Sequence, residues 1–242
     1  IVGKKGWLFT TEELNVTPHF AENVRLSVER IGLVNDEMAR RGIHLLTVIV
    51  PDKAEVYTEQ LGVERVGYVV ERRGMLSAAL AERGISVLDG SSALKRAKSR
   101  GDVFMRDDTH WSPLGSQAVS EAVADSLVGF ELAKANVTTR AVGTAQFDGD
   151  LLAYVPTGGL RPLMGPAQNQ IEQFETTVGT KSSLFDDVPI DVVLVGTSFS
   201  AKADWHFEGF LKQALQADIL NFAQEGRGPF APMEAFMASD TF

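Results

Sequence analysis

Two apolar runs constrain the fold of this chain more than any other feature. Residues 45–50 are continuously apolar or β-branched, and residues 190–195 are interrupted only by Asp191. Strands of this kind suit a parallel sheet that is buried on both faces. The two runs therefore predict an α/β fold with a buried parallel sheet.

Segments of helical periodicity separate these runs. Apolar residues recur at steps of three and four over residues 18–41, and Gly42 follows as a stop. The same reading predicts helices at 64–83, 91–99, from 113 onward, 205–215 and 231–238, and strands at 85–88, 103–105, 137–142 and 219–222. The rest of 129–189 is expected to be a long irregular excursion. The alternation predicts a mostly parallel sheet with helices on both faces, in one domain spanning residues 1–242.

Composition narrows the possible partners. The chain has 242 residues, with 23 Lys and Arg against 32 Asp and Glu, and its net charge of −9 argues against general nucleic-acid binding. The absence of cysteine excludes disulfides and cysteine-ligated metals but leaves the redox compartment open. No run approaches the roughly 18 apolar residues of a membrane helix. The chain opens on Ile1, which is compatible with a trimmed product, so a removed signal or anchor stays open.

Polar residues follow three of the predicted strands. Asp52 and Lys53 follow the first run, Asp108 and His110 follow 103–105, and Ser198 follows 190–195. Sites in open parallel sheets gather at the carboxyl ends of strands. We therefore expect an acid, a histidine and a serine to contribute to one site.

These residue types match nucleophilic acyl transfer. A serine needs a base to take its proton, and the base needs a third group to hold its tautomer. The prediction is Ser198 as nucleophile, His110 as general base and acid, and Asp108 as the group that orients His110. A strand feeding Gly196-Thr197-Ser198 would expose the hydroxyl much as a nucleophile elbow does, although the motif is not G-x-S-x-G. The turn into a helix also offers backbone N–H groups to an oxyanion.

Each residue has a simpler interpretation. Ser198 alone could be a helix cap, the D-x-H step could be surface or capping chemistry, and Asp107 could be solvated. Asp108 and His110 could bind a metal. A hydrolytic metal site, however, requires three or more protein ligands, and the chain has no H-x-H or H-x-x-x-H motif to supply them. His206, near a helix start, is the alternative base. The prediction includes no metal and no cofactor.

Several motifs are shared with a known family. A D-x-H-W motif at 108–111 precedes G-T-S at 196–198, and further matching pieces lie at 3–9, 50–53, 147–151 and 221–229. Together they resemble the alginate O-acetylation family of AlgJ, AlgX and AlgV, whose catalytic domain is SGNH-hydrolase-like. The resemblance spans nearly the whole chain. Ordinary SGNH hydrolases place the serine first and the D-x-x-H last, so the order here resembles a circular permutation.

The resemblance implies a three-layer, SGNH-hydrolase-like (flavodoxin-like) domain and an activity. It implies transfer of acetyl groups to mannuronate hydroxyls of the exopolysaccharide alginate, in the periplasm of a Gram-negative bacterium. Ser198, His110 and Asp108 would form the triad and pass through an acetyl-serine. No carbohydrate-binding module follows within these residues, which favours an AlgJ-like member. Membrane or periplasmic partner proteins would deliver the acetyl donor, and a membrane anchor outside these residues would associate the protein with the inner membrane.

Alginate is a polyanion, so an acidic protein would need a locally basic groove to bind it. The candidate side chains are Arg72, Arg73, Lys95, Arg96, Lys98, Arg100 and Arg106. Lys53 and Arg106 are favoured as substrate contacts because both sit at strand ends beside the proposed site. The asparagine and glycine that form the oxyanion hole of SGNH enzymes match no motif in this sequence. Asn221 is proposed as the oxyanion-hole asparagine without the support of a motif.

Two other classes of function stay open. The first is a non-catalytic polysaccharide-binding or scaffold component of a secretion complex. The second is a metal-dependent phosphoesterase that uses Asp107, Asp108 and His110. Hydrolase and transferase cannot be separated from the triad, because both use the same residues.

Overall fold

The computed structural model describes residues 1–242 except 16, 66, 156–157, 161–162, 164 and 180–188. The chain divides into two compact units that interleave along the sequence. The first unit comprises Ile1–Arg96, Arg106–Thr109 and Asp150–Ala167, and the second comprises Ala97–Met105, His110–Gly149 and Gln168–Phe242. One domain across residues 1–242 stays a prediction.

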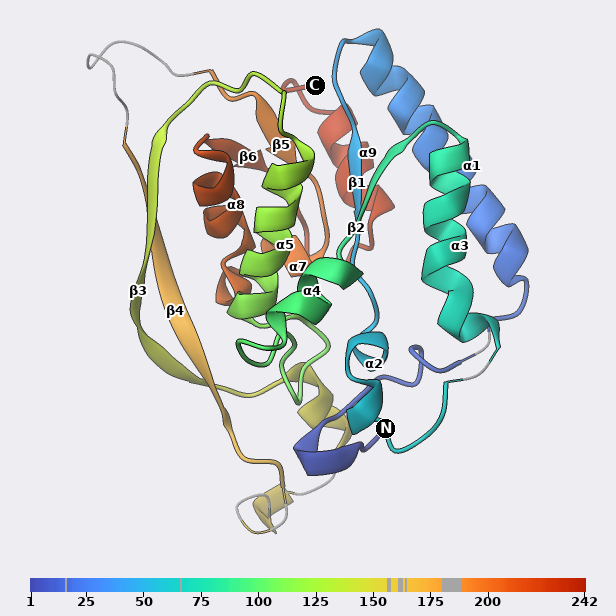
Figure 1. Ribbon diagram of the computed structural model, residues 1–242, viewed down its shortest axis with the longest axis vertical. Helices are drawn as coiled ribbons and strands as arrows, with labels where there is room; N and C mark the ends of the chain where they lie inside the picture. Colours follow the sequence, from blue (N-terminus) through green and yellow to red (C-terminus); the bar gives the residue numbers. More distant parts are fainter. Residues whose placement is uncertain (16, 66, 156–157, 161–162, 164, 180–188) are drawn as a thin grey trace. The chain divides into compact units, whose positions relative to one another are not determined.

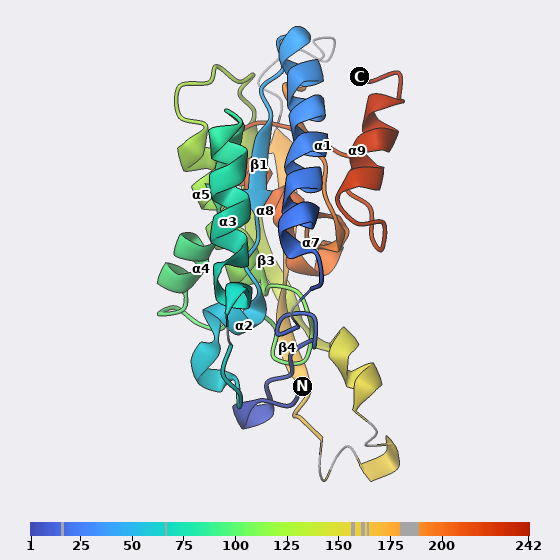
Figure 2. The ribbon, with the colours of Figure 1, turned by 90° about the vertical axis from the view of Figure 1, so that its right-hand side faces the viewer.

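A parallel strand pair organises the first unit. β1 (Leu46–Ile49) pairs with β2 (Ser86–Asp89), and α3 (Tyr68–Glu82) connects them. α1 (Phe20–Arg40) packs against α3, and the two helices lie side by side next to the strands (Figures 1 and 2). The predicted helices and the parallel pairing of the two strands are confirmed here.

The end of α1 follows from its sequence. Gly42 has a φ of 73°, a left-handed conformation that costs glycine little. This turn lets the Ile43 amide donate to the carbonyl of Met38 at 2.9 Å, which satisfies a carbonyl at the helix end. Gly42 is therefore the predicted stop, and the chain turns directly into β1.

The N-terminal segment packs on the short elements of this unit. Trp7 and Phe9 are 2% and 1% exposed, and the Trp7 ring centroid lies 4.0 Å from that of Tyr57. Between them, the Leu8 amide donates to the carbonyl of Arg106 at 2.8 Å. The segment thus joins the loop that carries Asp108. The remaining elements are η1 (Lys4–Gly6), α2 (Lys53–Val56), η2 (Thr58–Gln60), α4 (Ser91–Ala97), η3 (Asp150–Tyr154) and η4 (Gly158–Leu160).

A second parallel pair organises the second unit. β5 (Val192–Leu194) pairs with β6 (Ile219–Asn221), and the helical connection contains α7 (Ser198–Ala201), η5 (Ala203–Trp205) and α8 (Phe207–Leu215). α8 buries Phe207, Phe210 and Leu211 and packs against α5 (Pro113–Ser126). The Ser112 hydroxyl accepts a hydrogen bond from the Gly115 amide at 3.2 Å, which confirms the predicted cap of α5. α9 (Phe230–Met237) ends the described elements.

A long antiparallel hairpin contacts α8 (Figure 1). β3 (Asn136–Phe147) pairs with β4 (Asn169–Gly179), with a register shift between Ala141 and Gly143. The predicted strand 137–142 is confirmed and is longer than expected, whereas β4 falls in the predicted irregular excursion, part of which (156–157, 161–162, 164 and 180–188) lies outside the described residues. The less exposed Ile171 and Phe174 of β4 are three residues apart, so the period of two that marks a strand is broken.

The segment before the motif pairs through a single bridge. Residues 103–105 were expected to form a strand, but only Phe104 pairs, with Trp111. The Met105 amide donates to the carbonyl of His110 at 3.1 Å, so the chain folds back on itself around the motif. None of the helices in the described part of the chain has the length and apolarity to cross a membrane.

Candidate active site

A histidine and a serine meet in the second unit. His110 Nε2 lies 2.7 Å from Ser198 Oγ, a hydrogen-bonding distance. Ser198 is half-buried and is the first residue of α7, directly after the turn that follows β5. Because an imidazole next to a hydroxyl can take its proton, this pair has the geometry of a nucleophile and its base.

The turn before Ser198 depends on a small residue. A Cβ atom at Gly196 would lie 2.7 Å from the Ser200 hydroxyl and 3.1 Å from its Cβ, so a side chain there would force Ser200 to shift. The amides of Ser200 and Ala201 both bond the Thr197 carbonyl at 2.9 Å, which begins α7 immediately after the turn. The predicted strand–turn–helix arrangement around Ser198 is therefore present.

Aromatic rings hold the imidazole. His110 is 6% exposed, and its ring centroid lies 5.3 Å from that of Trp205, in a stacked arrangement, and 4.7 Å from that of Phe199. Phe199 also packs edge-on against Trp111, at 5.2 Å. These ring contacts reduce the freedom of the imidazole to turn away from Ser198.

Asp108 belongs to the first unit and is 1% exposed. Its Oδ2 accepts a hydrogen bond from the amide of Asp150 at 2.9 Å. Asp107 is also buried, at 0% exposed, and its carbonyl accepts from the Leu151 amide at 3.1 Å. The interpretation of Asp107 as a solvated residue was therefore wrong, because the start of η3 covers this loop.

Lys53 lies beneath the same loop, within the first unit. Its side chain is 2% exposed, and Nζ donates to the carbonyls of Asp108 at 2.6 Å and Arg106 at 3.4 Å. Burial lowers the pKa of Lys53 to about 8, although the negative charges of Glu13, Asp108, Asp150 and Asp107 oppose that shift. The role of Lys53 as a substrate contact stays a prediction, and its burial counts against it.

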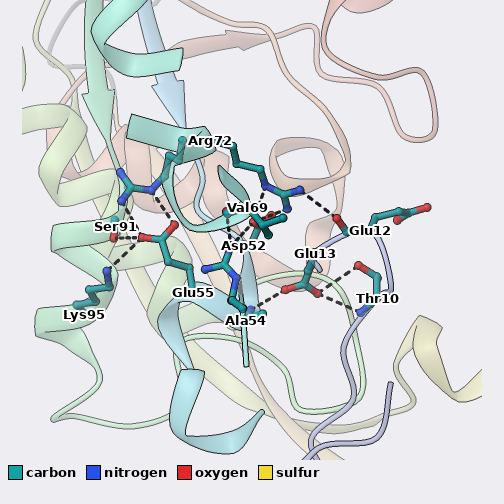
Figure 3. Close-up of polar contacts among 12 residues, drawn as sticks. Thr10, Glu12, Glu13, Asp52, Ala54, Glu55, Val69, Arg72, Ser91 and Lys95 are labelled. Atoms are coloured by element: carbon teal, nitrogen blue, oxygen red, sulfur yellow. Dashed lines mark hydrogen bonds and ion pairs between the residues drawn. The ribbon is translucent and has the colours of Figure 1, made fainter. Parts of the chain in front are cut away.

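The basic side chains that are candidates for binding the polymer differ in the contacts that they make. Arg72 binds the carboxylate of Asp52, while Arg73 and Lys95 both bind Glu55 (Figure 3). Arg106 is exposed, with its guanidinium carbon 5.9 Å from the Trp7 ring centroid. The role of Arg106 as a contact with an acidic polymer stays a prediction, and the exposure of its side chain is compatible with that role.

Asn221, at the end of β6, makes a different set of contacts from those of an oxyanion hole. Its Nδ2 donates to Glu208 Oε2 at 3.0 Å and to the Ser200 carbonyl at 3.4 Å, and its Oδ1 accepts from the Ala223 amide at 2.9 Å. These bonds join β6 to α7 and α8. The substrate-binding role of Asn221 stays a prediction.

His206 is not the partner of Ser198. Its Nε2 lies 2.7 Å from the Thr176 hydroxyl, and its ring packs against Phe174 and Phe210. Burial lowers its pKa, with Glu208 acting in the opposite direction. The alternative base of the sequence analysis therefore belongs to the contact between α8 and the hairpin.

Sequence reasoning missed several neighbours of the motif residues. Asp150 lies within the matching piece at 147–151, but the sequence predicts no role for it, nor for Phe199 or Trp205. The available signal was an acid next to Gly149 at the start of a helical turn. Aromatic packing on His110 left no comparable signal, because α7 and η5 lie about ninety residues further along the chain.

Comparisons with known proteins identify the family of this chain. The family model described as "SGNH hydrolase-like domain, acetyltransferase AlgX" matches residues 1–242. The chain belongs to this family. The predicted SGNH-hydrolase-like α/β fold and the resemblance to the AlgJ and AlgX proteins are thereby confirmed.

Named relatives cover the whole chain. The "Probable alginate O-acetylase AlgJ" of Pseudomonas aeruginosa is 35% identical over 258 residues, which cover 100% of this chain and 66% of that protein. The corresponding protein of Pseudomonas putida is 34% identical and covered over 65% of its length. This chain therefore spans slightly less than two thirds of these relatives. The solved O-acetyltransferase domain of Pseudomonas putida AlgJ has a TM-score of 0.91 at 33% identity, covering 100% of this chain and 85% of that one.

Proposed function

We propose that this chain is an O-acetyltransferase that acetylates mannuronate hydroxyls of alginate through an acetyl-serine at Ser198. The observation that carries the proposal is the 2.7 Å separation of His110 Nε2 and Ser198 Oγ. The names of the relatives as alginate O-acetylases support the reaction and the acceptor.

In the first half-reaction, Ser198 Oγ attacks the carbonyl carbon of an acetyl donor while His110 takes the hydroxyl proton. The tetrahedral intermediate collapses when the donor's leaving oxygen departs with the proton that His110 returns. The products are acetyl-Ser198 and the deacetylated donor. The amides of Ser198 and Phe199 at the start of α7 are suitable donors for the oxyanion, because the first N–H groups of a helix have no partner within it. The next two amides, of Ser200 and Ala201, bond the Thr197 carbonyl.

In the second half-reaction, a sugar hydroxyl attacks the acetyl carbon and His110 takes its proton. Ser198 leaves as the alcohol when it recovers the proton from His110. Water in place of the sugar gives acetylesterase activity by the same steps. The acceptor therefore decides between transfer and hydrolysis.

Asp108 completes the proposed triad. It precedes His110 by two residues, and its carboxylate is buried, which suits a group that holds an imidazole in one tautomer and stabilises the imidazolium. We propose the periplasm as the location, and partner proteins of an acetylation complex as the source of the donor, because the relatives belong to alginate biosynthesis.

The test is hydrolysis of a chromogenic acetyl ester. Ser198→Ala should lower kcat/KM about a thousandfold or more, because the nucleophile is lost. Ser200→Ala is the matched control, since it removes a hydroxyl from the same short helix and should leave kcat/KM within about threefold. Equal rates for wild type and Ser198→Ala would reject the catalytic proposal in favour of a polysaccharide-binding or scaffold role.

Chelation tests the phosphoesterase alternative. The Asp108 carboxylate already accepts a backbone hydrogen bond, and the acyl-transfer steps above need no metal. Treatment with EDTA should therefore leave ester hydrolysis unchanged. A loss of activity that added Zn²⁺ or Mn²⁺ restores would favour metal-assisted chemistry.

A further inference from the structure

Within the first unit, Asp150 and the loop at Arg106–Thr109 exchange hydrogen bonds in both directions. The Asp150 carboxylate accepts from Thr109, at 2.8 Å from its amide and 2.6 Å from its hydroxyl. In return, the Asp150 amide donates to Asp108 Oδ2 at 2.9 Å. Asp108 and Thr109 are therefore both held by Asp150, at the start of η3.

This exchange follows the logic of a capping box, in which side chain and backbone of two positions satisfy each other. The amide of Asp150 is the first of a short helical turn and has no acceptor within it. Asp108 supplies that acceptor. A second backbone bond, from the Leu151 amide to the Asp107 carbonyl, keeps the two segments in register.

The bonds restrict the movement of Asp108. A buried carboxylate must be hydrogen-bonded, and a bond to one of its oxygens fixes the rotation of the whole group. Oδ2 is directed at the Asp150 amide, so the direction of Oδ1 is fixed as well. Fixing the Thr109 amide also sets the backbone immediately before His110.

We propose that Asp150 is a positioning residue of the acyl-transfer site, which holds Asp108 through its amide and Thr109 through its carboxylate. The inference rests on the proposed function, because it assumes that Asp108 orients His110. Asp150 acts through the two residues that precede His110.

Lys53 and Asp150 both hold this loop, but replacing Asp150 gives the cleaner test of positioning, because it disturbs folding less. Lys53 is buried, so its replacement disturbs the core of the first unit, whereas Asp150 and its bonds to Thr109 are exposed. Exposed charge-assisted bonds contribute little to overall stability. Loss of Asp150 should therefore affect the rate much more than the melting temperature.

The experiment measures ester hydrolysis and thermal unfolding for a set of variants. Asp150→Ala should lower kcat ten- to a hundredfold, with KM within about twofold and Tm within a few degrees. Asp150→Asn, which keeps an acceptor for the Thr109 amide, should recover part of the loss. Asp148→Ala removes a neighbouring exposed carboxylate and should keep kcat within about twofold.

A double-mutant cycle tests the specific bond. Thr109→Val should lower kcat, Thr109→Ser should restore it, and Thr109→Val combined with Asp150→Ala should be no slower than Asp150→Ala alone. Wild-type kcat for Asp150→Ala, with Ser198→Ala inactive, overturns the positioning role and leaves the proposed function intact. A loss of kcat that parallels a loss of folded protein overturns it as well. If Ser198→Ala is as active as wild type, the proposed function itself fails.

Discussion

Two strand ends of this protein share a local construction and differ in chemical content. β1 and β5 are each followed by a short turn and a helix of four residues, α2 and α7. At the end of β1, Asp52 is paired with Arg72 (Figure 3) and with Arg65. Lys53 is buried against backbone carbonyls. At the end of β5, a half-buried serine faces one imidazole.

The difference shows why position in the fold does not by itself define a site. Both ends lie where parallel strands present polar residues, but the charges at the β1 end already have partners. Glu13 extends this network, since its carboxylate accepts from the Ala54 amide at 2.6 Å and from the Thr10 amide at 3.1 Å (Figure 3). A reactive end keeps one group available for substrate, whereas a structural end uses its polar groups internally.

The largest expected effect is at the base. His110→Ala should lower kcat/KM for the chromogenic ester about a thousandfold or more, because Ser198 then has no proton acceptor. His206→Gln should stay within about threefold, since His206 bonds Thr176 instead. A large loss with His206→Gln and none with His110→Ala would reverse the assignment of the base.

The next largest effect is the dependence of the free energy of unfolding on pH, which we attribute to Lys53 at the end of β1. Its pKa is about 8 in the folded protein and 10.5 ordinarily, so between these values the unfolded chain binds a proton that the folded chain does not. The free energy of unfolding should therefore rise with pH across this window, with Lys53 contributing up to about 3 kcal/mol. Below about pH 8, the contribution of Lys53 should not change with pH. Urea unfolding of wild type and Lys53→Met at pH 7.5, 9 and 10.5 should show the rise in wild type alone. Parallel curves for the two proteins would contradict it.

A smaller effect separates stability from activity at the β1 end. Asp52→Asn leaves the guanidinium of Arg65, whose side chain is 5% exposed, without its carboxylate, and should lower the free energy of unfolding by about 2 kcal/mol. Activity per folded molecule should stay within about twofold. Asp36→Asn is the matched control, because its ion pair with Arg83 is exposed and should change stability by less than about 1 kcal/mol. Lost activity in fully folded Asp52→Asn would make this end part of the site.

The smallest effect concerns the acidic polymer. Arg106→Gln should weaken binding of a polymannuronate oligomer about two- to fivefold at low salt, and the difference should shrink as salt screens the charge. Arg25→Gln removes an exposed charge that is already paired with Glu22, and should leave binding unchanged. Titrations at two salt concentrations would measure both, and equal binding by wild type and Arg106→Gln would remove Arg106 from the groove.

Much of the fold could be predicted because its signals are local. The run at 45–50, the stop at Gly42 and the cap at Ser112 each act within a few residues, and each is present in the structure. Strand β4 was not predicted, because its apolar residues Ile171, Phe174 and Val178 recur at steps of three and four and not at the period of two that marks a strand.

The site was predictable only in part. Ser198 and His110 carried a chemical signal in their residue types, and the structure brings them together. The burial of Lys53 depends on Trp7 and Phe9, whose ring centroids lie 5.9 and 5.3 Å from its ammonium. Such contacts arise from packing between distant segments, which no local pattern records.

Mass spectrometry of the protein after incubation with an acetyl ester tests the central claim most directly. Wild type should carry one acetyl group on Ser198, and a polymannuronate oligomer should remove that group and gain it. Ser198→Ala should carry none. Ester turnover without any adduct on Ser198, or an equal adduct on Ser198→Ala, would contradict an acetyl-serine mechanism at this site.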